Sequence, residues 1–84
     1  MINIRSKRNE SYKGDSSIQI QVFNPAQGSW VGLFNLYPQR DRQNRKFYTN
    51  DRFVNTFSTI TEAKHFAQGM PEAKAHANNS HFIL

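Results

Sequence analysis

The clearest hydrophobic pattern in the chain lies in the segment SSIQIQVFNP. Ile18, Ile20 and Val22 alternate with glutamines, so every second side chain is aliphatic. Because successive side chains of a β-strand point to opposite faces, this period of two predicts a strand with one buried and one solvent-facing side. The following residues NPAQG include Pro25, which fixes φ, and Gly28, which accepts positive φ, and they predict a turn.

The next segment, SWVGLFNLYP, predicts a second strand with apolar side chains on both faces. A strand that is buried on both faces is typical of the centre of a sheet. Gly32 indicates either a bulge or a place where a large side chain lies across the backbone. Five to seven residues separate this strand from the next one, so the second and third strands are expected to form a long-looped hairpin.

The third strand is interrupted in the sequence pattern. Residues 46–49 (KFYT) are typical of a strand, residues 50–52 (NDR) of a turn or bulge, and residues 53–57 (FVNTF) of a strand again. One bulged strand and two short strands both fit this pattern.

Helical signals follow the strands. Thr59 and Glu62 have the spacing of a capping box, in which each side chain bonds to a free backbone N–H of the first helical turn. Gly69 suits the end of this helix. Pro71 predicts a second short helix or a kinked extension, because proline is tolerated in a first helical turn. The apolar residues 81–84 are expected to pack as an edge strand or against a partner.

This order of elements predicts the α+β class. The expected architecture is a three-stranded antiparallel sheet, with four strands as the alternative, packed against one C-terminal helix with a short helical extension. The 84 residues suffice for one domain, which we assign to residues 16–84. Residues 1–15 are polar and charged, and we expect a basic N-terminal arm that is mobile or poorly anchored.

The net charge of +5 is concentrated in two segments. Residues 1–14 carry a net +3 and residues 38–52 carry another +3, whereas the rest of the chain sums to −1. Such basic segments favour an anionic partner, of which nucleic acid is the commonest. The alternative is that the charge only keeps a small protein soluble.

Basic side chains interleaved with aromatic ones form the candidate nucleic-acid site. Single strands bind to exposed rings and to cations that follow the backbone, whereas a sheet binds a duplex through Arg or Lys that project from one face. The alternative is that the rings pack structurally and the cations are solvated. The candidates are Trp30, Tyr37, Arg40, Arg42, Arg45, Lys46 and Arg52, with Arg5, Lys7 and Arg8 from the N-terminal arm.

Catalytic, metal and cofactor sites have little support in the sequence. There is no cysteine, the three histidines lack metal-binding spacing, and the four glycines form no phosphate-binding loop. The six acids are scattered singly, so no pair suits acid–base catalysis. A set of Tyr48, Arg45, Lys46 and His81 could be assembled for RNA cleavage, but any basic protein offers such a set. We therefore expect a non-enzyme without cofactor or metal.

The same composition bears on location. The absence of cysteine favours the cytoplasm. No apolar run approaches the roughly 20 residues of a membrane span, and the N-terminal charges are not followed by the apolar stretch of a secretory signal. We expect a soluble cytoplasmic protein with no membrane partner.

Three short motifs carry a family resemblance. Residues 12–14 (YKG), 28–30 (GSW) and 57–63 (FSTITEA) resemble a family of small stand-alone bacterial proteins, which implies three strands and a helix but no activity. The order of elements is also similar to the AP2-like arm-binding domains of phage integrases, whose sheet enters the DNA major groove. The chain differs from those domains in lacking an attached catalytic domain and in clustering its arginines within a predicted loop.

These observations lead to two functional hypotheses. The first is a small basic module that binds DNA or RNA through its basic loop and sheet face. The second is a protein-interaction or homodimerising module, for example an accessory protein from a phage or mobile element. The second hypothesis draws on the apolar residues 82–84 and the two-faced second strand, which would leave a patch that needs a partner.

Overall fold

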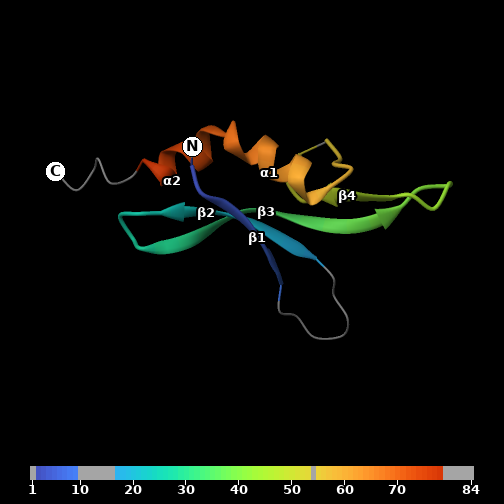
Figure 1. Cartoon of the computed structure of the whole chain (residues 1–84), viewed down its shortest axis with the longest axis horizontal. Coiled ribbons are helices and arrows are strands. Elements are labelled where there is room, and N and C mark those ends of the chain that lie inside the picture. Colours follow the sequence, from blue (N-terminus) through green and yellow to red (C-terminus); the bar gives the residue numbers. More distant parts are fainter. Residues whose placement is uncertain (1, 10–16, 54, 79–84) are drawn as a thin grey trace.

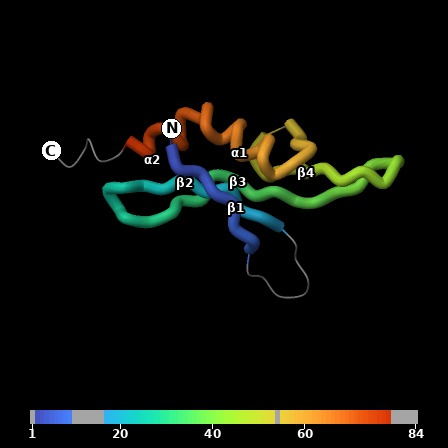
Figure 2. The backbone as a smooth tube through the Cα atoms, viewed as in Figure 1, coloured from blue at the N-terminus to red at the C-terminus, as the bar shows by residue number. Residues whose placement is uncertain are grey.

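Four strands followed by two helices build the fold (Figure 1). The computed structural model describes residues 2–9, 17–53 and 55–78. The strands form one antiparallel sheet in the order β1-β2-β3-β4, and both helices lie along one side of it (Figures 1 and 2). The elements are β1 (Ile4–Arg8), β2 (Ile18–Asn24), β3 (Ser29–Arg40), β4 (Lys46–Asn50), α1 (Ile60–Gln68) and α2 (Pro71–Ala77).

The predicted α+β class with an antiparallel sheet is confirmed. The sheet has four strands, which was the alternative, and the helical layer consists of two separate helices rather than one helix with an extension. Neither helix has both the length and the apolar character needed to cross a bilayer, as judged over the described residues. The expected packing of residues 81–84 falls outside the described part of the chain.

The fourth strand is β1, and it corrects the expectation of a mobile arm for residues 4–8. β1 runs antiparallel to β2, with Ile4 opposite Val22 and Arg8 opposite Ile18. Backbone pairing needs no apolar side chains, so a basic segment can form an edge strand once a partner strand is available. Residues 1 and 10–15 of the expected arm lie outside the described residues.

Gly32 fulfils both predicted roles. The register between β2 and β3 shifts after Ile20, which makes Leu33 the extra residue of a bulge. On the backbone of Gly32, a Cβ atom would lie 2.4 Å from Nε2 of Gln19, so any other residue would displace the Gln19 amide from this position.

The predicted hairpin forms between β3 and β4, and its connection has the lower number of the five to seven residues expected. β3 continues through Pro38 to Arg40, so only residues 41–45 connect it to β4. Pro38 lies opposite Tyr48, whose N–H bonds to Phe57 on the other edge of β4. The missing N–H of proline therefore breaks no bond to β4, and β3 can extend through it. The resulting two-stranded ribbon projects beyond the helices (Figure 1).

The predicted resumption of the strand over residues 53–57 was wrong. Among the described residues of this range, 53 and 55–57, an isolated bridge takes the place of the strand, and in it Tyr48 and Phe57 exchange two backbone hydrogen bonds of 2.7 and 2.9 Å. This bridge covers part of the free edge of β4 and leads the chain towards α1.

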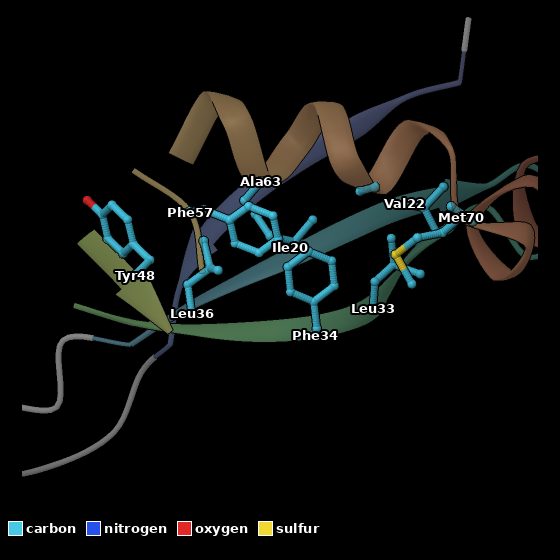
Figure 3. Packing of buried hydrophobic residues seen from close by; sticks show 11 residues of the cluster. Ile20, Val22, Leu33, Phe34, Leu36, Tyr48, Phe57, Ala63 and Met70 are labelled. Carbon is cyan, nitrogen blue, oxygen red and sulfur yellow. The ribbon is translucent and has the colours of Figure 1, made fainter. Parts of the chain in front are cut away.

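The hydrophobic core lies between the sheet and the two helices (Figure 3). Ile20, Val22 and Leu36 contribute from the sheet, and alanines of the helices allow close packing. The ring of Phe34 is 5.4 Å from Phe53 in an edge-to-face contact. The buried residues of the core are Ile20, Val22, Leu33, Phe34, Leu36, Tyr48, Phe57, Ala63, Ala67, Met70 and Ala73.

The predicted helix start at Thr59 is confirmed. Its hydroxyl accepts a hydrogen bond of 3.1 Å from the backbone N–H of Glu62, which satisfies one free donor of the first turn.

Replacing Thr59 by alanine should lower the free energy of unfolding by about 1 kcal/mol, because this N–H loses its acceptor. Urea denaturation followed by circular dichroism measures the change, with Thr59→Ser as the control that keeps the hydroxyl. Equal stability of the alanine and serine variants would show that the cap contributes nothing.

Candidate nucleic-acid interface

The side of the sheet opposite α1 and α2 carries no described helix or strand, and we call it the uncovered face. Its side chains alternate along each strand with those that point into the core. They come from all four strands: Arg5, Lys7, Gln19, Gln21, Phe23, Trp30, Asn35, Tyr37, Gln39, Phe47 and Thr49.

Arg5, on the edge strand β1, is held in place on this face. Its guanidinium lies 4.2 Å from the ring centroid of Trp30, and its Nε donates a 2.6 Å hydrogen bond to Oε1 of Gln21. Gln21 in turn donates to Gln19 over 2.7 Å, and Gln19 lies across Gly32. The stacking and the row of amides orient a cation that could otherwise rotate freely.

Trp30 is neither a core residue nor fully exposed. It is half-buried on the uncovered face, where its ring makes an edge-to-face contact of 5.4 Å with Phe23. Tyr37 is farther along β3 on the same face and is 38% exposed. The two aromatic candidates therefore share a face with Arg5.

An acid lies beside this face and is bound by an amide. Asn35 donates to the carboxylate of Asp51 through its backbone N–H (3.0 Å) and through its side chain (2.8 Å). Partial burial acts to raise the pKa of Asp51, but these hydrogen bonds outweigh it and hold the pKa below its ordinary value. Asn9 of the N-terminal segment extends the network by donating to Asn35 over 3.1 Å.

The tip of the β3–β4 hairpin is a turn built around Asp41. The backbone N–H groups of Gln43 and Arg45 donate to Oδ1 of Asp41 over 2.9 and 2.8 Å. Asn44 has a φ of 63° and donates to the carbonyl of Asp41, as in a type I turn followed by a left-handed residue. The hydrogen bond from Arg45 contributes most to holding the pKa of Asp41 below its usual value. This acid is therefore a structural part of the tip.

Two of the four tip cations are engaged within the turn. Arg45 forms an ion pair of 3.2 Å with Asp41, and Arg40 donates to a backbone carbonyl of the turn over 2.9 Å. Arg42 and Lys46 are exposed and form no ion pair with any described carboxylate. These two side chains are available to an external anion.

Two predicted candidates lie elsewhere. Arg52 donates to the carbonyl of Leu33 over 2.9 Å and pairs with the carboxylate of Glu72 on α2, so it binds the helical layer to the sheet. Arg8 lies opposite Ile18, and the alternation of β1 directs it to the helical side. The structure therefore does not bring Arg52 and Arg8 to the uncovered face.

The two basic segments share the uncovered face only in part. Arg5 and Lys7 project from it, whereas the alternation of the ribbon directs Arg40 and Lys46 to its other side. Leu36 is the last residue of β3 that pairs with β2. Arg40, where the tip begins, lies four residues further along β3, which is a distance of about 13 Å. A ligand must therefore extend along the ribbon to contact both segments.

The amide side chains of Gln19, Gln21, Asn35 and Gln39 were not among the sequence candidates. The sequence pattern could have identified them, because they occupy the polar positions that alternate with the apolar residues of β2 and β3. Their number on one face becomes apparent only when the strands are aligned.

No family model, curated protein or solved structure matches the chain. In the described ranges, no three His, Cys, Asp or Glu side chains group as metal ligands would. The functional argument therefore rests on the geometry of the uncovered face and the hairpin.

Acid should destabilise the fold through Asp41 and Asp51. Because both pKa values are lowered by folding, their contribution is present above the unfolded value of about 4 and is lost as the pH falls through the folded values. Urea denaturation should show that the wild type exceeds an Asp41→Asn/Asp51→Asn variant in stability at pH 6, and that the difference shrinks towards about pH 2. A constant difference over this range would contradict the assignment.

Proposed function

We propose that the protein is a small non-catalytic module that binds nucleic acid through the uncovered face and the β3–β4 hairpin. The observation that carries this proposal is the fixed cation Arg5, set among amide and aromatic side chains on a face that no described element covers. Lys7 adds charge on the same face, and the exposed Arg42 and Lys46 add charge at the tip of the hairpin.

The chemistry of this face suits both parts of a nucleic acid. Cations contact phosphate and position the protein, whereas glutamine and asparagine can donate to and accept from base edges. Gln39 and Tyr37 are exposed on the ribbon, where they could reach bases while Arg42 and Lys46 contact the backbone. The partly exposed rings offer stacking surfaces for unpaired bases.

The shape of the hairpin favours duplex DNA over duplex RNA. Beyond Ile18, the first residue of β2, the ribbon of β3 and β4 is only two strands wide, and the B-form major groove accommodates a two-stranded ribbon. The deep and narrow major groove of A-form RNA does not. The order of elements resembles that of AP2-like arm-binding domains, whose sheet enters the DNA major groove, but the arginines of this chain cluster at the hairpin tip rather than along the strands.

Fluorescence anisotropy with labelled duplex DNA, duplex RNA and single-stranded DNA tests the proposal. We expect duplex DNA to bind most tightly at low salt. With four phosphates neutralised by Arg5, Lys7, Arg42 and Lys46, the logarithm of the binding constant should fall with the logarithm of salt concentration with a slope of about −4. The absence of binding to every probe at low salt would refute the proposal.

A further inference from the structure

The outer edge of β1 presents unpaired backbone groups in a regular row. Phe23 donates to the carbonyl of Asn3, and Asn9 donates to that of Ser17, so the odd-numbered residues of this segment bond to β2. The N–H and C=O groups of Ile4, Ser6 and Arg8 consequently point away from the sheet. No described residue bonds to them, whereas the carbonyl of Ile2 just before them is capped by the side chain of Gln68.

The two edges of the sheet therefore differ. On β4, the bridge to Phe57 occupies the outward groups of Tyr48, so part of that edge is closed. On β1, no described residue bonds to the three successive outward-facing positions. Of these two edges, as far as the described residues form them, β1 is therefore the one on which an incoming strand could make a regular ladder.

A groove of about 450 Å³ lies directly beside this edge, between β1 and α1. Ile4 of β1 lines the groove with an apolar side chain. The other lining residues belong to α1 and are Thr61, Lys64, His65 and Gln68. Side chains of an added strand would alternate between this groove and the uncovered face. The groove thus offers a site for every second residue of the added strand, next to the cation Lys64.

The positive charge at the outer edge of β1 favours an acidic partner. Arg5, Lys7 and Arg8 belong to β1, Lys64 lines the groove, and no acid is among the lining residues. A second copy that paired through its own β1 would place these cations opposite each other, and like charges directly across strands are destabilising. An extended segment rich in Asp or Glu would instead meet a cation on each side.

We propose that the outer edge of β1 binds an extended acidic segment of a partner protein, which adds to the sheet as a fifth strand. Backbone bonds to Ile4, Ser6 and Arg8 supply the register, and the groove beside Ile4 accepts an apolar side chain of the segment. This site does not depend on the proposed nucleic-acid binding.

The probe is a labelled synthetic peptide in which valine alternates with glutamate. Anisotropy should show saturable binding, and the backbone amides of Ile4, Ser6 and Arg8 should gain protection from hydrogen exchange. A peptide with lysine in place of glutamate should not bind, and an acidic peptide with N-methylated alternate amides should bind at least about tenfold more weakly because it cannot complete the ladder.

Ser6→Pro is the matched change on the protein. Proline at Ser6 removes an outward N–H and leaves the bonds to β2 intact, so the peptide should bind about tenfold more weakly while duplex DNA binding stays within about twofold. If circular dichroism shows that this variant is unfolded, the N-methylated peptide on the wild-type protein decides the question.

Four results would overturn the proposal. These are no binding of the acidic peptide, equal binding of the lysine or N-methylated peptide, undiminished binding to a folded Ser6→Pro variant, or protection of the β1 amides through self-association without peptide. The last result would identify a second copy as the occupant. Loss of DNA binding alone would affect only the proposed function.

Discussion

Replacing Arg5, Lys7, Arg42 and Lys46 together by glutamine should weaken duplex DNA binding by about 100-fold or more at low salt. Each side chain is proposed to neutralise one phosphate, so the salt dependence should also fall from a slope of about −4 almost to zero. Glutamine removes the charge but keeps a polar side chain with part of the aliphatic stem, and the turn should persist because it is held by Asp41. Anisotropy titrations at several salt concentrations measure both quantities.

The helical layer supplies a control of equal charge. An Arg5→Gln/Lys7→Gln variant and a Lys64→Gln/Lys74→Gln variant each lower the net charge by two, but only the first pair lies on the uncovered face. The first variant should bind about tenfold more weakly, whereas the second should stay within about twofold of wild type. Equal losses would mean that net charge alone drives binding and that the face has no special role.

Replacing Phe34 by alanine should remove about 3 to 5 kcal/mol from the free energy of unfolding. Phe34 is 2% exposed, and its ring lies 5.4 Å from Phe53, 6.1 Å from Phe57 and 6.3 Å from Phe66. A domain of this size has a total of about 4 to 13 kcal/mol, so the variant should lose a large part of its stability. Urea denaturation followed by circular dichroism measures the loss.

Phe47→Ala is the matched control for this core substitution. Phe47 belongs to β4 and is half-buried on the uncovered face, away from the helices. Its truncation removes the same atoms but leaves no enclosed cavity, so the cost should stay below about 1.5 kcal/mol. Similar losses for the two variants would contradict the placement of the core between sheet and helices.

The parts of the fold that could be predicted from the sequence have local causes. The alternation of Ile18, Ile20 and Val22, the hydroxyl of Thr59 and the proline at position 71 each act within a few residues of their own position. Gly32 was also recognisable, because a glycine inside a strand pattern needs a specific reason.

The parts that were missed depend on distant pairing. β1 is basic because it is an edge strand, and charged side chains are a common protection of such edges. Nothing within residues 4–8 indicates that β2 is available as a partner. The continuation of β3 past Pro38 to Arg40 has a related reason, since only the register with β4 shows that the N–H group which proline lacks is not needed.

The candidate site shows the same division. Sequence patterning identified Arg5 and Trp30 separately, but their contact joins residues that are 25 positions apart and needs both strands in register. The pattern also counted Arg52 as a binding residue, whereas it pairs with Glu72. The sequence gives the number of cationic side chains, whereas the structure shows which of them already have partners.

The most direct test of the central claim is a titration of the isotope-labelled protein with duplex DNA, followed by nuclear magnetic resonance. We predict that the signals of the Trp30 indole N–H and of the Gln19, Gln21 and Gln39 side-chain amides shift in a saturable, salt-sensitive manner, while those of α1 and α2 remain unchanged. Shifts confined to the helices, or no shifts at low salt, would contradict binding through the uncovered face.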